Sequence, residues 1–236
     1  MNGDHVNEYN AYSKSDAITV NVVEKTQASV TTAPTPKTDL KYTGDEQELV
    51  TKGTANGGTV KYSLGSSPWS TEIPTAKDAA TYTVQYKVVG DSAHTDTAPV
   101  TLTVTIGPKV LHSSDLEQSG GSATKVYDSN ANSSITVRVR ASSLYGTDTL
   151  PIYGSAVYNS TKVADADTIT FTPTPITTGN YTLAASEVLT ITGAKITARD
   201  VTIASVTATP REYDKTNLDV TVSGGTVVNA ILGDDV

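Results

Sequence analysis

The chain has 236 residues, a formal net charge of −8 and a sequence pI near 4.8. The acidity argues against nucleic-acid binding, which needs clustered Lys and Arg against phosphates, and it weakens a role at an anionic membrane surface. Cys is absent, so disulfides, thiol chemistry and Cys-ligated metal sites are excluded. Forty residues are Thr, whose branched side chain suits a half-solvated β-sheet. The composition predicts an all-β chain rather than a disordered linker, because the alternation described below is too regular for a linker.

Residues 1–25 open with polar and acidic residues where a signal peptide would need a basic head and an apolar core. No apolar run approaches the ~18–20 residues of a membrane span, so we expect no membrane insertion within this segment. Ile18, Val20 and Val22 alternate with polar residues, as residues 100–106 do further along. We therefore predict that residues 1–25 hold the terminal strand of a preceding repeat.

Later segments also alternate between apolar and polar residues. The pattern recurs at residues 82–88, 100–106 and 135–139. A period of two with one apolar face is typical of a strand in a sheet that is covered on one side. Gly-, Asn- and Ser-rich turns separate these runs, and no stretch has sustained helical periodicity. Short strands with frequent turns favour β-sandwiches.

Three stretches begin in the same way, with a tyrosine at a strand opening: Tyr42, Tyr127 and Tyr213. Two of them are followed at a distance by a second tyrosine, Tyr82 or Tyr181, which enters a terminal strand. Such internal repetition indicates an array of modules. We predict a first module at 26–107, a second at 108–194 and a partial third at 195–236.

The second tyrosines lie in sequences that resemble strand F of immunoglobulin (Ig) domains, with an aliphatic residue in place of the Cys. In that pattern the tyrosine hydroxyl reaches back to an upstream backbone group. We predict this structural role for Tyr82 and Tyr181, in preference to ligand contact.

The ordered set of motifs resembles two kinds of Ig-like repeat of bacterial surface proteins. Residues 40–44, 57–64, 69–74 and 80–91 resemble MBG-type repeats. Residues 126–128 with 179–181, and 212–216 with 233–236, resemble YDG-type repeats. The glycine of the Tyr-Asp-Gly signature is replaced by Ser129 in one copy and by Lys215 in the other, which leaves the turn type open.

The resemblance implies tandem Ig-like β-sandwich modules of a secreted or cell-wall-attached, adhesin-like bacterial protein, in which such repeats serve as stalk modules. We therefore expect an extracellular spacer that displays a distal binding region. Two alternatives stay open: an adhesin module that binds a host or matrix glycan or protein, and an accessory module of an extracellular polysaccharide-degrading enzyme. We also expect head-to-tail self-association through terminal strands that lack partners.

Catalysis finds little support in the sequence, and we predict no enzyme and no cofactor. The three histidines, His5, His94 and His112, fall at different places in the predicted modules, whereas a nucleophilic triad must converge in space. The acidic fragments 165–167 and 233–235 could favour calcium, but they do not match a spaced calcium loop, so solvated turn acids are the preferred interpretation. An intramolecular Lys–Asn crosslink, implied by the resemblance for Lys41 or Lys125, is not expected because residues 100–106 and 188–192 contain no Asn.

The candidate ligand contacts are aromatic. Trp69 follows a Ser-Ser-Pro turn, where it could stack on a sugar or, as we prefer, fold over its own module. Tyr145, Tyr153 and Tyr158 lie in the long middle of the second module, and insertions between strands often carry binding function. We name Trp69, Tyr145, Tyr153 and Tyr158 as the predicted ligand-contact residues.

Overall fold

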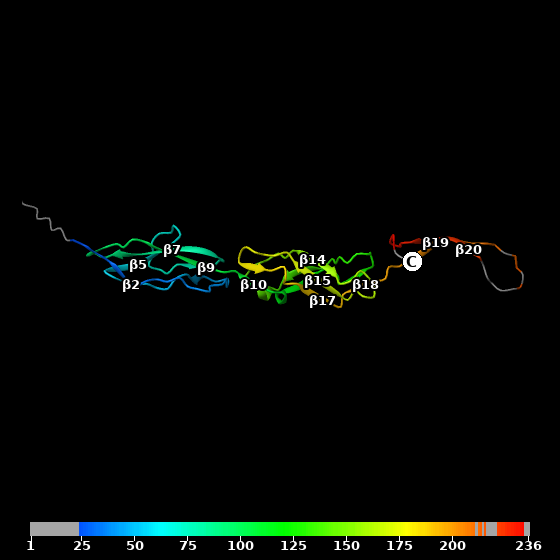
Figure 1. Cartoon of the computed structure of the whole chain (residues 1–236), viewed down its shortest axis with the longest axis horizontal. Helices are drawn as coiled ribbons and strands as arrows, with labels where there is room; N and C mark the ends of the chain where they lie inside the picture. The colour runs from blue at the N-terminus through cyan, green and yellow to red at the C-terminus, as the bar shows by residue number, and fades with distance from the viewer. Residues whose placement is uncertain (1–23, 211, 214, 216–220, 234–236) are drawn as a thin grey trace, which may run out of the picture. The chain divides into compact units, whose positions relative to one another are not determined.

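A computed structural model of the chain describes residues 24–210, 212–213, 215 and 221–233 (Figure 1). These residues form β-strands and two short 3-10 helices, η1 (Ser113–Asp115) and η2 (Ala141–Ser143), and the described residues contain no α-helix. The all-β prediction is confirmed. The strands are joined in small sheets of two or three, and the finer prediction of tandem Ig-like sandwiches is considered below as a proposal.

The chain divides into two compact units. Among the described residues, unit 1 holds 24–37, 48–75 and 82–104, and unit 2 holds 38–47, 76–81 and the residues from 105 onward. Segments 38–47 and 76–81 therefore pack with unit 2, although the sequence assigns them to the first predicted module. The predicted module boundaries themselves stay predictions.

Unit 1 is built around a three-stranded sheet in the order β5 (Gly58–Leu64), β7 (Ala80–Gly90), β9 (Val100–Ile106). On β7, the side chains of Val84 and Val88 are completely buried and alternate with more exposed residues, as the period of two predicts. The shorter strands pair as β1 (Thr26–Gln27) with β8 (His94–Thr95) and β2 (Ser29–Thr32) with β4 (Thr54–Asn56), whereas β3 (Gln47–Glu48) pairs with β6 (Thr75–Ala76) where the chain passes from one unit to the other.

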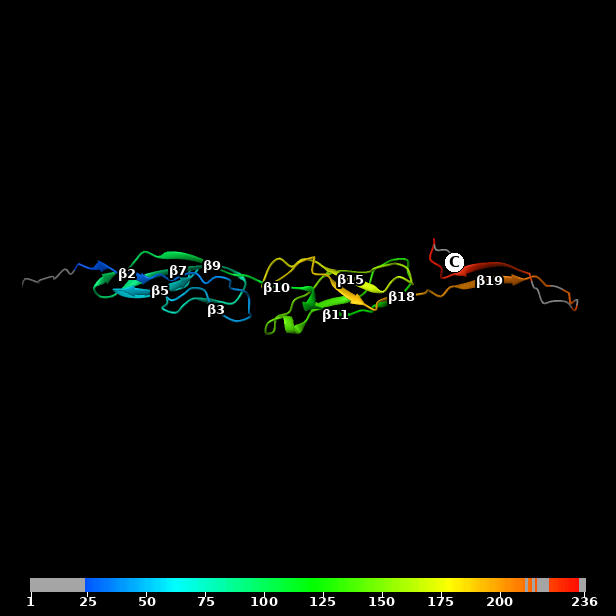
Figure 2. The ribbon, with the colours of Figure 1, turned by 60° about the horizontal axis from the view of Figure 1, so that its bottom comes forward.

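Unit 2 contains a second three-stranded sheet, in the order β14 (Gly154–Tyr158), β15 (Thr168–Pro173), β17 (Leu189–Thr192) (Figures 1 and 2). Its two-stranded pairs are β10 (Lys109–Leu111) parallel to β16 (Tyr181–Leu183), β11 (Leu116–Gly120) antiparallel to β13 (Thr136–Val139), β12 (Thr124–Val126) parallel to β18 (Lys195–Thr197), and β19 (Thr202–Ala208) antiparallel to β20 (Val222–Val228).

One hydrophobic core lies between these strands of unit 2. Leu111, Leu116, Ile169, Leu183 and Ile196 come from five different strands, and all are completely or almost completely buried. Burying an aliphatic side chain of this size contributes about 1.5–3 kcal/mol. Tyr42, from segment 38–47, belongs to the same core. This membership explains why its segment packs with unit 2.

Each tyrosine opening is followed, two residues later, by backbone in the left-handed region. The φ angles are 81° at Gly44, 61° at Ser129 and 60° at Lys215. Glycine is the residue that adopts this conformation at least cost. Ser129 and Lys215 therefore adopt a left-handed backbone without being glycine.

The predicted alternating strands at 82–88, 100–106 and 135–139 correspond to β7, β9 and β13. The predicted strand at 18–22, and with it most of the predicted terminal segment 1–25, lies outside the described residues.

Candidate functional site: the tyrosine–aspartate cluster

The structure does not bring the four predicted ligand-contact residues together as one exposed surface. Tyr158 is 3% exposed and packs in the core of unit 2, which corrects its assignment as a ligand contact because a buried ring offers no face to a ligand. Tyr153 is 72% exposed. Trp69, in unit 1, is half-buried, and the Lys87 ammonium lies 5.2 Å from the centre of its ring, in line with the preferred interpretation that it folds over its own module.

Tyr145 is half-buried and takes part in a cluster that the sequence did not identify as a site. Its ring lies edge-to-face with that of Tyr42, with centroids 5.7 Å apart, and Tyr42 makes a similar contact with Tyr181 at 5.4 Å. Edge-to-face pairs of this kind are favourable for aromatic quadrupoles. The Lys109 ammonium covers the Tyr145 ring at 4.4 Å and donates to the Ser143 carbonyl at 2.7 Å.

The polar centre of this cluster is the carboxylate of Asp148. The hydroxyls of Tyr42 and Tyr181 both donate to its Oδ2, at 2.6 and 2.8 Å. We call these three residues the Asp148 clamp. Asp148 is presented by a turn in which its N–H donates to the Tyr145 carbonyl at 3.0 Å. The clamp thus joins residues 106 positions apart in the sequence.

Backbone pairing positions both tyrosines. Tyr42 follows a parallel bridge between Lys41 and Gly107, and its N–H donates to the Gly107 carbonyl at 2.8 Å. Tyr181 begins β16, opposite Lys109 of β10. Its hydroxyl also accepts from the N–H of Tyr145 at 2.8 Å, so it reaches an upstream backbone group as predicted. The equivalent role for Tyr82 stays a prediction.

A second polar contact holds segment 76–81 beside the clamp. Asn180 accepts from the N–H of Ala79 through its side-chain oxygen at 2.8 Å and donates to the Asp78 carboxylate at 2.9 Å. Its own carbonyl accepts from the N–H of Lys109 at 2.9 Å. Asn180 and the clamp therefore hold both early segments, 38–47 and 76–81, within unit 2.

The hydrogen bonds fix the charge state of the clamp. The hydrogen bond to Asp148, followed by burial, raises the pKa of Tyr42 far above the ordinary phenol value. Burial raises the pKa of Tyr181. The hydrogen bonds from Tyr42 and then Tyr181 lower the pKa of the Asp148 carboxyl. Two protonated donors and one ionised acceptor therefore coexist throughout the neutral range.

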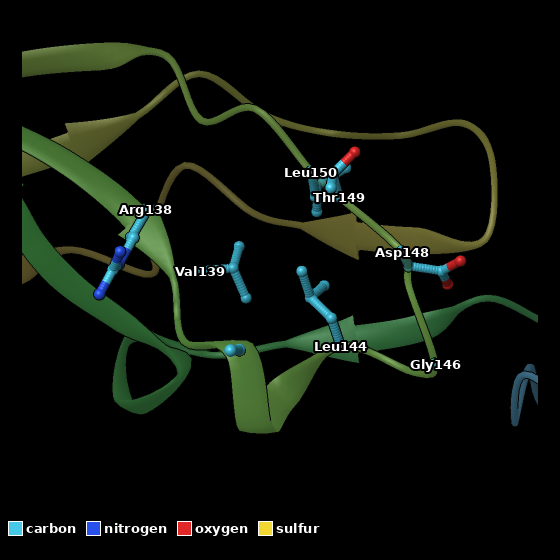
Figure 3. Close-up of a pocket in the computed structure, with 8 residues that line it drawn as sticks. Arg138, Val139, Leu144, Gly146, Asp148, Thr149 and Leu150 are labelled. Atoms are coloured by element: carbon cyan, nitrogen blue, oxygen red, sulfur yellow. The ribbon is translucent and has the colours of Figure 1, made fainter.

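A hollow of about 330 Å³ adjoins Asp148 and is lined mainly by apolar side chains, Val139, Leu144 and Leu150 among them. In Figure 3 the Asp148 carboxylate points away from Val139 and Leu144. Arg138, at the other side, donates to the Glu117 carboxylate at 2.8 Å. The charged groups of the lining are thus directed to other protein groups, which makes the hollow a poor site for a polar substrate.

The two described histidines each contact an acidic side chain of their own unit. His94 contacts Asp91 in unit 1, and His112 contacts Glu187 in unit 2, at 2.6 and 3.2 Å. His5 lies outside the described residues, as do Asp234 and Asp235 of the second acidic fragment.

Neither metal binding nor a membrane span is indicated by the described residues. Asp167 accepts from the Asn159 side chain at 2.8 Å, and no group of three or more His, Asp or Glu side chains in the described ranges is placed to hold a metal ion. Across those ranges there is also no helix of the length and apolar character needed to cross a bilayer.

Lys125, one of the two lysines considered for a crosslink, organises the turn that follows Tyr127. The three N–H groups of its ammonium lie within hydrogen-bond distance of four oxygens: the Asp128 carboxylate at 2.6 Å, the Asn130 side-chain oxygen at 3.0 Å, and the carbonyls of Asn130 and Asn132. A charged donor with four oxygen acceptors stabilises this loop. The loop includes Ser129, whose left-handed backbone is thereby supported.

Comparison with known proteins gives no match: no family model, no curated protein and no solved structure is significantly similar to this chain.

Proposed function

We propose that this chain is a structural segment of a bacterial cell-surface or secreted protein, in which small β modules act as a spacer that displays a distal binding region. The proposal rests on the resemblance of its motifs to MBG- and YDG-type repeats and on the composition of a Thr-rich, acidic β chain. We also propose that the modules are Ig-like sandwiches arranged in tandem.

The strand pairing supports a repeated plan. An antiparallel pair flanks each tyrosine opening: β2 and β4 around Tyr42, β11 and β13 around Tyr127, and β19 and β20 around Tyr213. Each opening then passes through a left-handed residue, as described above. A common local plan in three successive stretches is what a chain of modules requires.

The observation that carries the spacer proposal is the Asp148 clamp. A spacer must keep its segments joined under load. The clamp and Asn180 attach segments 38–47 and 76–81 to the rest of unit 2, by side-chain hydrogen bonds that include an ionised acceptor. Charge-assisted hydrogen bonds of this kind are about twice as strong as neutral ones.

Single-molecule force spectroscopy tests the proposal. The chain would be pulled between handles at its two ends, with Asp148→Ala compared against Asp165→Ala, which removes an exposed carboxylate of unit 2. We expect Asp148→Ala to lower the force of the first rupture of unit 2, and Asp165→Ala to leave it unchanged. Equal rupture forces for all three proteins would remove the mechanical basis of the proposal.

Binding of a host or matrix glycan or protein is the second candidate function, favoured by the 72% exposure of Tyr153 and the partly open ring of Trp69. A glycan array and a panel of matrix proteins, probed with wild type and with Tyr153→Ala, would test it. Binding that depends on Tyr153 would favour this function over a pure spacer. An accessory role beside a polysaccharide-degrading domain is the remaining alternative, and the reading frame around this segment would decide it.

A further inference from the structure

Two lysines face each other on the three-stranded sheet of unit 1. Lys61 of β5 lies directly opposite Lys87 of β7. The neighbouring pair, Val60 and Val88, is buried, so the two lysines lie on the other face of the sheet, where both are half-buried. Like charges at directly opposite positions of an antiparallel pair are destabilising. The stability of the fold therefore does not account for this pair.

One acid compensates the two lysines only in part. The Asp96 carboxylate accepts from the Lys87 ammonium at 2.8 Å and, through its other oxygen, from the N–H of Gly90 at 3.0 Å. The hydrogen bond from Lys87 lowers the pKa of Asp96, so this carboxyl is ionised at neutral pH. Lys61 has no ion-pair partner in the described part of the chain. Two ammonium groups and one carboxylate leave one net positive charge among the three, in a chain whose net charge is −8.

An aromatic ring lies beside these charges. An isolated bridge to β5, which is an edge strand of the sheet, places the segment that contains Trp69 along that edge. Trp69 is half-buried, and the Lys87 ammonium lies 5.2 Å from its ring centre. Gln85, two residues before Lys87 on the same face, donates to a threonine hydroxyl of β9 at 3.3 Å. We call the following set the basic–aromatic patch: Lys61, Lys87, Gln85 and Trp69.

A hollow of about 260 Å³ opens beside the patch. Its lining includes Thr59, which precedes Lys61 by two residues on the same face of β5. Thr71 and Lys52 also line it, and all three lining residues named here are exposed. The lining thus offers hydroxyl groups and a further ammonium, which suit a polar ligand rather than an apolar one.

We propose that the basic–aromatic patch binds a glycan that carries an acidic sugar, with a carboxylate or sulfate group. The Lys61 ammonium, which no carboxylate of the described chain neutralises, pairs with that group. The indole of Trp69 packs on the apolar C–H face of the sugar ring, and the Gln85 amide and the hydroxyls of the hollow bond to sugar hydroxyls. One net positive charge in an acidic chain favours a glycan with an isolated acidic sugar over a long polyanion, which the net charge of −8 repels.

This proposal goes beyond the spacer role. It rests on the second candidate function, glycan binding, and assigns to it a site in unit 1 and a class of ligand. It also accounts for the opposed lysines, because a bound anion beside them would relieve their repulsion. An acidic peptide would pair with the same lysines but would not need the indole ring, so dependence on Trp69 separates the two kinds of ligand.

A glycan array tests the ligand class. It would hold neutral glycans beside the same glycans capped with sialic acid, a uronic acid or sulfate. We expect the full chain to bind capped glycans and not their neutral parents, and a comparison of the caps shows whether carboxylate or sulfate is preferred. Equal binding of neutral and capped glycans would retain glycan binding but overturn the acidic-sugar proposal. Absence of binding to every glycan would overturn both.

Titration calorimetry with the best capped glycan tests the role of the lysines. Lys61→Gln should weaken the affinity about tenfold or more, because it removes the charged partner of the acidic group. In urea denaturation the same variant should be as stable as wild type or more stable, since the repulsion from Lys87 is relieved. Lys162→Gln is the matched control, because it removes an exposed ammonium of unit 2 and changes the net charge equally, and it should bind normally. Equal losses of affinity from the two variants, or a loss in Lys61→Gln that comes with destabilisation, would contradict the proposal.

Two aromatic variants locate the site. Trp69→Ala should weaken binding of the capped glycan, and Trp69→Phe, which keeps a ring, should retain part of the affinity. Undiminished binding in Trp69→Ala would show that charge alone is recognised, as for an acidic peptide, and would overturn the proposal. Loss of binding in Tyr153→Ala, with Trp69→Ala unaffected, would place the glycan site in unit 2 and would overturn it as well.

Discussion

Replacing Asp148 with alanine gives the strongest single-site test of the structure. The substitution removes the acceptor for two tyrosine hydroxyls. Tyr181 keeps one hydrogen bond, as acceptor from the N–H of Tyr145. Tyr42 is 2% exposed, and its hydroxyl would be left without an acceptor in the core. The cost should therefore be concentrated at Tyr42.

The expected magnitude follows from the two hydrogen bonds. A hydrogen bond to a charged group contributes about 1.5–3 kcal/mol, and the lower end applies here because Asp148 is only half-buried. Two such bonds give a loss of about 3 kcal/mol in the free energy of unfolding of unit 2. Asp148→Asn keeps an oxygen acceptor but loses its charge, so it should cost about 1 kcal/mol.

Urea denaturation, followed by tyrosine fluorescence and far-UV circular dichroism, measures these losses. Tyr42→Phe and the double variant Tyr42→Phe/Asp148→Ala complete a double-mutant cycle, in which we expect a coupling free energy of about 1–1.5 kcal/mol. The reasoning is refuted if Asp148→Ala costs no more than the exposed control Asp165→Ala, or if the losses from Tyr42→Phe and Asp148→Ala are simply additive.

Three further predictions concern the turns and the pH dependence. Ser129→Gly should raise the free energy of unfolding of unit 2 by about 0.5–1 kcal/mol in urea denaturation. It relieves a left-handed backbone penalty of about 1–2 kcal/mol, and the entropic cost of glycine is smaller than that. Ser142→Gly, at a position without positive φ, should lower the free energy of unfolding. Gly44→Ala should lower the free energy of unfolding by about 2–4 kcal/mol, because the new Cβ would lie 2.6 Å from the Tyr145 Cβ and φ is 81°. Gly65→Ala, where φ is also positive but the space is open, should cost less. Equal losses would show that the contact with Tyr145 is unimportant. Because the native pKa of Asp148 is lowered, the stability difference between wild type and Asp148→Asn should be complete above the ordinary Asp pKa of 3.8 and should disappear as pH falls through the lower native value. Denaturation curves from neutral pH to strong acid measure this difference. A difference that changes between pH 5 and 8 would contradict the prediction.

The strand pattern was readable in the sequence because alternation is a local property. Val84 and Val88 are buried on β7 as their spacing predicts. The same logic applies to Tyr158, which ends β14 opposite the buried Ile169 and continues the inward-facing positions of that strand. Strand alternation therefore predicts a buried ring at Tyr158, whereas its place in a long insertion favours ligand contact.

The Asp148 clamp could not be predicted, because its partners are distant in sequence. Tyr42 and Tyr181 were identified as repeated tyrosines, but nothing local to Tyr42 indicates an acceptor 106 residues away. Asp148 itself follows a Gly-Thr turn and resembles any solvated turn acid. Asn180 beside Tyr181 carried equally little signal, since Asn in a turn is usually explained by the turn alone.

The parallel strand pairs could not be predicted from the sequence either. β10 lies parallel to β16, and β12 to β18, although each strand has only three residues and no α-helix lies in the connections 112–180 and 127–194. Such short runs have too few residues for alternation to indicate direction. The turn after Tyr127 is left-handed at Ser129, where glycine would be preferred, and the turn type there was open in the sequence because Ser replaces the glycine.

Amide hydrogen exchange at single residues tests the central claim most directly, which is that the Asp148 clamp holds segment 38–47 within unit 2 while Asn180 holds segment 76–81. The N–H groups of Tyr42 and Ala79 are bonded to Gly107 and Asn180, and Val137 in β13 provides a reference in the same unit. In Asp148→Ala we predict much faster exchange at Tyr42, and in Asn180→Ala much faster exchange at Ala79, with the protection of Val137 retained in both. Unchanged protection at Tyr42 in Asp148→Ala would contradict the account.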